Sequence, residues 1–344
     1  MKSCVTGKRL IILAGPHKTA SSYIQSSLFS LSQKRVAGLV DNFYMPTFNG
    51  DSHPWKVHQY IATYFLTEFP ERTDTFSQVE ALFEEMFSSP KDILICSEVF
   101  DKLDVMGVTR LRAKFEPHFS KILVVLTYRE MLSHMLSQGN QQATSPNPNI
   151  DPFLSHFFVD MNQRAASQTS AAINAMVRVV GRENVTIVDY YGVQAADKDI
   201  LVAILEVIGV KNASDVAAHL NSSDDVHNNL SKTELVERQF VAILNDFRIL
   251  YGCPEIVFKS GKVLSKSKQN LLKKFPMMKI DLSLFVHLSG IFDSKLRGDL
   301  GDRIVFGNRT QNLLAAHNVK YEEVDVRAVI RDKVLMNKIK KSCV

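Results

Sequence analysis

The chain lacks the features that would assign it to a membrane or secreted class. None of its apolar runs reaches the roughly 18 residues that a helix needs to span a bilayer. The short apolar run near the N-terminus ends in a turn rather than at a small-residue cleavage site, so we interpret it as a strand and not as a signal peptide. We therefore expect a cytoplasmic protein without a membrane span.

Cysteine is also scarce, with four residues in 344 and none of the spacings that metal ligands show. We therefore expect free thiols in a reducing compartment and no metal site. The formal charge of +5 is mild; it suits an anionic small ligand, and we expect no nucleic-acid partner. Repeats and breaks in composition are absent, so we predict one elaborated domain over residues 1–344, with a core over about residues 8–250 and a C-terminal helical part. The oligomeric state stays open.

Short apolar runs recur between helical stretches along the chain. Such runs, rich in β-branched residues, are typical of strands in a parallel sheet that is covered on both faces. The predicted fold is α/β, a central parallel sheet flanked by helices, with strands Leu10–Ala14, Ile93–Cys96, Ile122–Thr127 and Val185–Asp189. Ligands bind such sheets beyond the carboxyl ends of the strands. A basic helix is predicted from Val324 to about Lys341.

The first predicted strand runs directly into a segment typical of phosphate binding. Gly15 and Pro16 form a turn, Lys18 and Thr19 follow, and a helix begins at about Ala20. The first turn of a helix presents free N–H groups and the positive end of the helix dipole, and both attract an anion. A Walker A loop needs a longer spacing after its first glycine and a second glycine before the lysine, and this segment has neither. The segment is therefore not typical of an ordinary ATP- or GTP-binding loop.

The segment resembles the 5′-phosphosulfate loop of sulfotransferases that use 3′-phosphoadenosine 5′-phosphosulfate, written roughly Gly-x-x-Lys-[Thr/Ser]-Gly-[Thr/Ser]-Thr. The matching positions are Gly15, Lys18, Thr19, Ser21 and Ser22. Ala20 stands in place of the family's second glycine, and His17 before the lysine resembles a form common among bacterial and protist members. The resemblance implies a P-loop-like sulfotransferase core in which this loop and the first turn of the helix, Ala20 included, hold the 5′-phosphate.

A second motif of the same family lies more than a hundred residues further along the chain. In that family an arginine follows a strand, a serine lies eight residues later, and the two bind the 3′-phosphate. Here Arg129 follows the strand Ile122–Thr127, and Ser137 lies eight residues beyond Arg129. An arginine fork and a hydroxyl donor both suit a phosphate. The two residues after Arg129 depart from the family's Asp-Pro, and His134, which we expect to face outward, replaces its second arginine.

The strand Val185–Asp189 resembles the family's strand that ends in a tyrosine beside the nucleotide. Tyr190 fits that position best, and Tyr191 is the near alternative. An aromatic ring there can border adenine or stack on it, whereas a core tyrosine that caps the strand would give the same sequence pattern.

The resemblance also implies how the sulfuryl group is transferred. Ser97-Glu98 follows the strand Ile93–Cys96, and several carbohydrate and protein sulfotransferases have a Ser-Glu pair in a similar place with the glutamate as general base. Glu98 is therefore the predicted base, and His17 is its rival. Lys18 is expected to neutralise the bridging oxygen as its bond to sulfur breaks, without a metal.

The expected reaction moves the sulfuryl group to a hydroxyl of a carbohydrate or a small hydroxylated metabolite and releases 3′-phosphoadenosine 5′-phosphate. The early segment with His58 is a candidate for acceptor contacts, and its Trp55 can either pack in the core or stack on a sugar or phenol. Two alternatives stay open at this point: a nucleotide or metabolite kinase with a variant loop, and a non-catalytic nucleotide-binding relative.

Overall fold

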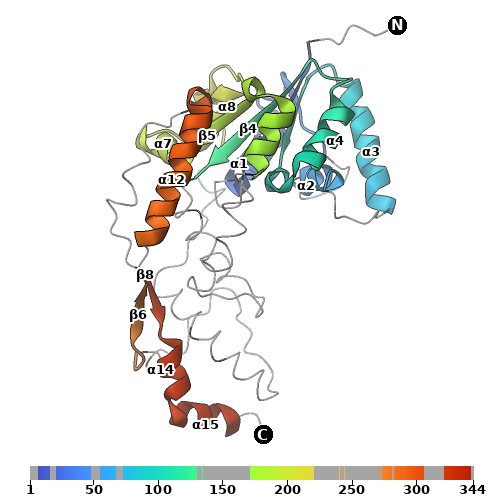
Figure 1. The fold of residues 1–344 in the computed structure, drawn as a ribbon. Helices are drawn as coiled ribbons and strands as arrows, with labels where there is room; N and C mark the ends of the chain where they lie inside the picture. Colours follow the sequence, from blue (N-terminus) through green and yellow to red (C-terminus); the bar gives the residue numbers. More distant parts are fainter. Residues whose placement is uncertain are drawn as a thin grey trace. The chain divides into compact units, whose positions relative to one another are not determined.

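The computed structural model describes residues 7–15, 21–47, 55–66, 73–129, 134, 171–220, 240, 244, 270, 273–280, 283–305 and 321–341. The chain forms two compact units, whose elements Figure 1 shows. The first unit takes Met1–Glu130, Ala165–Val226 and Phe292–Gln311, and the second takes Met131–Arg164, His227–Ile291 and Asn312–Val344. The predicted single domain over residues 1–344 is neither confirmed nor contradicted by this division.

The first unit is built on a six-stranded sheet in the order β2-β3-β1-β4-β5-β7, and every pair of neighbours in it is parallel. Its strands are β1 (Arg9–Ala14), β2 (Phe43–Tyr44), β3 (Asp92–Cys96), β4 (Lys121–Tyr128), β5 (Val185–Asp189) and β7 (Ile304–Val305). This confirms the predicted fold class. The four predicted strands are the central ones, each within one residue at either end. The edge strands β2 and β7 were not predicted, because two residues give no apolar run.

Alternate residues of the strands point to opposite faces of the sheet, and each face has its own helices. Leu10 and Ile12 pack with α2 (Trp55–Tyr64), α3 (Thr73–Ser88), α4 (Val105–Phe115) and the helical residues 171–180. Ile11 and Leu13 pack with α1 (Ser21–Gln33), α8 (Ile200–Val207) and α9 (Ala213–Ala217). Burial on both faces explains why the central strands are almost continuously apolar.

The helix that follows β1 and the helical residues that precede β5 pack on opposite faces of the sheet. Helix α1, directly after β1, packs on one face, whereas the chain after β4 returns to β5 through the helical residues 171–180 on the other. The register aligns Leu13 with Cys96 of β3 and with Val125 of β4, so the three strands reach their carboxyl ends side by side. In open α/β sheets, ligands bind at such a switch point beyond the strand ends.

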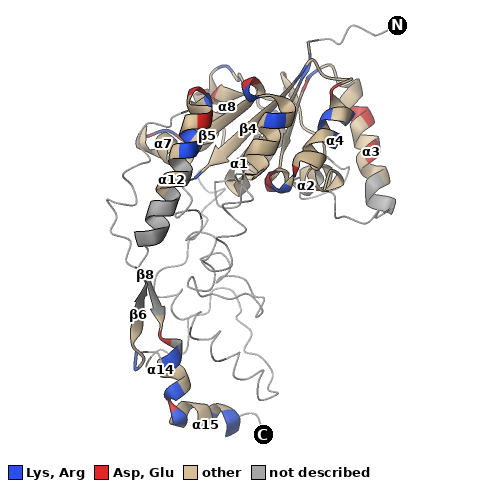
Figure 2. Ribbon diagram, in the orientation of Figure 1, with Lys and Arg blue, Asp and Glu red and all other residues tan. Residues whose placement is uncertain are grey.

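The described part of the second unit contains an antiparallel pair of strands, β6 (Met277–Ile280) and β8 (Tyr321–Val324), and the helices α14 (Val326–Arg331) and α15 (Lys333–Lys341). Lysine and arginine residues, blue in Figure 2, are spread along both helices. The prediction of one continuous basic helix was wrong, because Asp332 interrupts it. The Asp332 carboxylate accepts from the N–H groups of Val334 and Leu335, both at 3.0 Å, and so begins a new helix.

Candidate functional site

The structure describes the two ends of the predicted phosphate loop. Gly15 is buried directly after β1, and Ser21 and Ser22 are the first two residues of α1. Ser21 is buried and Ser22 is exposed. The middle of the loop, with His17, Lys18, Thr19 and Ala20, lies outside the described residues, so the roles assigned to these four stay predictions.

Glu98 lies beside the start of α1. It is the first residue of the short helix η1 (Glu98–Lys102), which Ser97 caps by accepting from the Val99 N–H at 3.1 Å. The N–H of Ser97 donates to the carbonyl of Leu13 at 3.1 Å, which ties the end of β3 to β1. The Ser21 hydroxyl donates to Glu98 Oε2 at 3.3 Å. A carboxylate and the first turn of α1 are therefore neighbours at the carboxyl edge of the sheet.

Arg129 follows β4 at the same edge and contacts two tyrosines. Its Nε donates to the Tyr191 hydroxyl at 3.1 Å. The guanidinium carbon lies 5.5 Å from the ring centre of Tyr190 and 5.4 Å from that of Tyr191, within the range of cation–π attraction. The structure thus brings the predicted phosphate ligand together with both tyrosine candidates for the nucleotide site. Ser137 lies outside the described residues.

His58 of α2 stands where the ladder between β2 and β3 would continue. The N–H of Asp92 donates to the carbonyl of Asn42, and the same offset would pair the N–H of Cys96 with the carbonyl of Pro46. The imidazole of His58 lies between these two backbone groups and replaces the direct hydrogen bond. Its Nδ1 accepts from the Cys96 N–H at 3.1 Å, and its Nε2 donates to the Pro46 carbonyl at 3.1 Å. His58 thus bridges the chain after β2 and the end of β3, where the two no longer pair directly.

Both ring nitrogens of His58 have backbone partners, which fixes the neutral tautomer with its proton on Nε2. Burial lowers the pKa of His58 to about 4, and the hydrogen bonds to Pro46 and Cys96 only partly oppose that shift. The expected acceptor contacts of His58 stay a prediction; the geometry shows that its imidazole holds the end of β3, which leads into Ser97-Glu98. Sequence reasoning had no signal for this contact, because it depends on where β2 ends.

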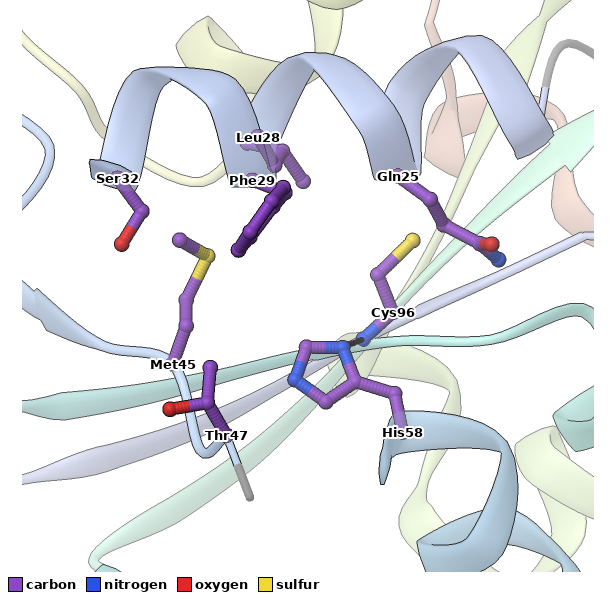
Figure 3. Close-up of a pocket in the computed structure, with 8 residues that line it drawn as sticks. All are labelled: Gln25, Leu28, Phe29, Ser32, Met45, Thr47, His58 and Cys96. Carbon is purple, nitrogen blue, oxygen red and sulfur yellow. Dashed lines mark hydrogen bonds between the residues drawn. The ribbon is translucent and has the colours of Figure 1, made fainter. Parts of the chain in front are cut away.

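A cavity of about 20 Å³ lies beside His58, with room for about one water molecule. Figure 3 shows its lining, which comes from α1, from the chain after β2 and from the end of β3: Gln25, Leu28, Phe29, Ser32, Met45, Thr47, His58 and Cys96. Burial raises the pKa of the Cys96 thiol to about 12, a hydrogen bond with Gln25 opposes this, and the charge of Glu98 adds to it. The thiol therefore stays protonated at neutral pH and is no nucleophile.

A larger cavity of about 300 Å³ lies at the opposite edge, where β4 and β5 begin. Among the residues that line it are Arg112 and Glu116, an exposed ion pair of 2.7 Å, which contributes little in water. Its position at the amino ends of parallel strands does not match where ligands bind such sheets, so we assign it no role.

The described residues include no group of three or more histidine, cysteine, aspartate or glutamate side chains placed to hold a metal ion. Within the same part of the chain, no helix is both long and apolar enough to cross a bilayer.

His134 is buried, with 5 % exposed, so the prediction that it faces outward was wrong. Its apolar sequence neighbours could have indicated this.

No protein-family model matches the chain, and no curated protein matches it in sequence. Among solved structures it is similar to a sulfotransferase from Alicyclobacillus acidocaldarius, with 10 % identity and a TM-score of 0.42 over 85 % of this chain and 95 % of that one. It is also similar to the sulfotransferase domain of the Synechococcus PCC 7002 olefin synthase, with 10 % identity and a TM-score of 0.38 over 80 % and 97 % of the two chains. Both neighbours are sulfotransferases. Likenesses this distant carry no argument about function, which rests on the residues of this chain.

Proposed function

We propose that this chain is a sulfotransferase that transfers a sulfuryl group from 3′-phosphoadenosine 5′-phosphosulfate to a hydroxyl of a carbohydrate or small hydroxylated metabolite. The observation that carries this proposal is the position of its two donor motifs. They follow β1 and β4, which are adjacent parallel strands, and the helix after β1 and the helical residues before β5 pack on opposite faces. The donor nucleotide has phosphates on both sides of its ribose, and two anion sites at one switch point suit such a molecule.

The donor site is proposed to use these motifs in two halves. The 5′-phosphate is held by the loop and the start of α1, and the 3′-phosphate by Arg129 and Ser137. Tyr190 borders the adenine. The residues assigned to the 5′-phosphate are Gly15, Lys18, Thr19, Ala20, Ser21 and Ser22.

In the proposed step the acceptor oxygen bonds to sulfur while the bond from sulfur to the bridging phosphate oxygen breaks. The acceptor proton passes to Glu98, and Lys18 neutralises the charge that builds on the leaving phosphate. The contact of Glu98 with Ser21 supports this assignment, because it puts a carboxylate one hydrogen bond away from the first turn of α1. His17 is the rival base. The step needs no metal.

A thermal-shift screen tests the donor class. We expect 3′-phosphoadenosine 5′-phosphate to raise the melting temperature more than ATP, ADP or GTP at equal concentration, because only that ligand has a 3′-phosphate for Arg129. A magnesium-dependent shift with ATP and none with the bisphosphate would contradict the proposal and favour the kinase alternative.

Lys18→Ala tests the chemical step. Turnover is expected to fall roughly 10²- to 10³-fold, the usual effect of removing one group aimed at the charge of a transition state. Lys34→Ala is the matched control, because it removes a lysine just beyond the other end of α1. Full activity in the Lys18 variant would refute the proposed mechanism, as would an equal loss in both variants.

A further inference from the structure

A buried carboxylate at the carboxyl end of β5 links the C-terminal part of the first unit to the tyrosines around Arg129. Asp189 is completely buried, with 0 % exposed, and caps α7 (Tyr190–Ala195). Its Oδ1 accepts from the Tyr191 N–H at 3.1 Å, and its Oδ2 accepts from Arg297 Nη2 at 3.1 Å. Arg297 lies on α12 (Ser283–Leu300), in the part of that helix that belongs to the first unit.

Tyr191, whose backbone is fixed by Asp189, in turn contacts Arg129. Its hydroxyl accepts from Arg129 Nε. The ring of Tyr190 meets that of Tyr191 edge-on at 5.5 Å, and each ring also contacts the guanidinium. A guanidinium is a rigid planar fork, so fixing its Nε and its plane also fixes the direction of its terminal N–H groups.

The physical chemistry of Asp189 makes the chain sensitive to Arg297. A carboxylate without contact to water is stabilised by a positive partner, and removing Arg297 takes that part of its compensation away. This favours the uptake of a proton by Asp189 or a movement of its side chain toward water. Either response weakens the acceptor that holds the first turn of α7, and with it the position of Tyr191.

We propose that Arg297, through Asp189 and Tyr191, is a positioning residue that sets Arg129 for the 3′-phosphate of the donor. This inference rests on the proposed function and extends it, because it makes α12 part of how the nucleotide is selected. Without Arg297, Arg129 still supplies charge but no longer two directed N–H groups. Binding of the 3′-phosphate is weakened, and binding of the 5′-phosphate is not.

Calorimetry on the full chain separates these two effects with two probes, 3′-phosphoadenosine 5′-phosphate and adenosine 5′-monophosphate. The ratio of their affinities measures the contribution of the 3′-phosphate alone. Arg297→Met is expected to lower this ratio about tenfold, the value of one well-directed hydrogen bond to a charged group. Arg297→Lys keeps the charge and is expected to restore part of the ratio. Tyr191→Phe removes only a hydroxyl and is expected to lower the ratio in the same direction.

Arg303→Met is the matched control. Arg303 comes from the same C-terminal segment and also binds β5, but at the amino end of the strand. It donates to the carbonyls of Val185 at 3.0 Å and Glu183 at 2.8 Å and to the Thr186 hydroxyl at 3.0 Å. We expect Arg303→Met to lower stability and to leave the affinity ratio unchanged.

The outcomes separate the inference from the proposed function. If Arg297→Met weakens both probes equally, or if the two arginine variants change the ratio alike, Arg297 is merely structural and the inference is overturned. If Arg297→Met does not fold, an unchanged ratio in Tyr191→Phe overturns it in the same way. If the wild-type chain does not prefer the bisphosphate at all, the proposed function itself fails.

Discussion

Protonation of His58 is expected to destabilise the protein as the pH falls below about 6.5. The imidazole has a pKa of about 4 in the folded chain, against its ordinary value of 6.5 in the unfolded chain, so the unfolded chain binds the proton more tightly. The stabilisation is fully present above pH 6.5 and is lost as the pH falls toward 4. The whole window is worth about 3 kcal/mol, and about 2 kcal/mol of it is lost between pH 7.5 and pH 5. The cause is burial, because the charged imidazole would lose its contact with water in the folded chain.

The assay is urea unfolding of the wild type and of His58→Gln at several values of pH. Glutamine can accept from the Cys96 N–H and donate to the Pro46 carbonyl, but it does not titrate. All other titrating groups are common to the two proteins and cancel in the comparison. The advantage of the wild type over the variant is expected to shrink by about 2 kcal/mol from pH 7.5 to pH 5. A difference that stays constant over that range would refute the assignment of His58 as a neutral bridge.

Two further predictions concern Lys8 and Glu98. Lys8 donates from Nζ to the carbonyls of Met86, Phe87 and Ser89 at the end of α3, at 3.1, 2.9 and 2.8 Å. Lys8→Met is therefore expected to lower the free energy of unfolding by about 2–3 kcal/mol, measured by urea unfolding, with unchanged nucleotide affinity in calorimetry. Glu98→Gln is expected to lower kcat roughly 10²- to 10⁴-fold with little change in donor affinity; activity that survives it would move the role of base to His17.

The central sheet could be predicted from the sequence because burial on both faces leaves a local trace. A strand such as Ile93–Cys96 has to be apolar at every position, so it appears in the sequence as a continuous run of apolar residues. The place of Glu98 followed from the same logic, because parallel strands bring their carboxyl ends to one edge. The role of a side chain at that edge could not be predicted in the same way, because it depends on neighbours that are distant in sequence. Ser21 and Glu98, for example, are in contact but lie 77 positions apart.

Residues whose position depends on distant partners left no such trace. Arg297 is 108 positions from Asp189, and nothing in its own segment distinguishes it from a surface arginine. The role of His58 depends on where β2 stops, and β2 is two residues long. The break at Asp332 could have been predicted, because an aspartate in a helical pattern is as suited to begin a helix as to continue one.

The arrangement of the strands bears on which nucleotide the edge suits. A triphosphate is one continuous chain of charge, and a single glycine-rich loop at a helix N-terminus can wrap it. This chain has a shorter loop after β1 and a second cation after β4, and parallel neighbours lie only about 4.8 Å apart. In the proposed donor site these two positions bind separate phosphates, one at the start of α1 and the other at Arg129. A ligand that meets both needs separated phosphates, which a ribose substituted at both its 3′ and 5′ positions provides. We therefore propose that Arg129, which contacts both tyrosines of the turn capped by Asp189, is the group on which discrimination against a triphosphate depends.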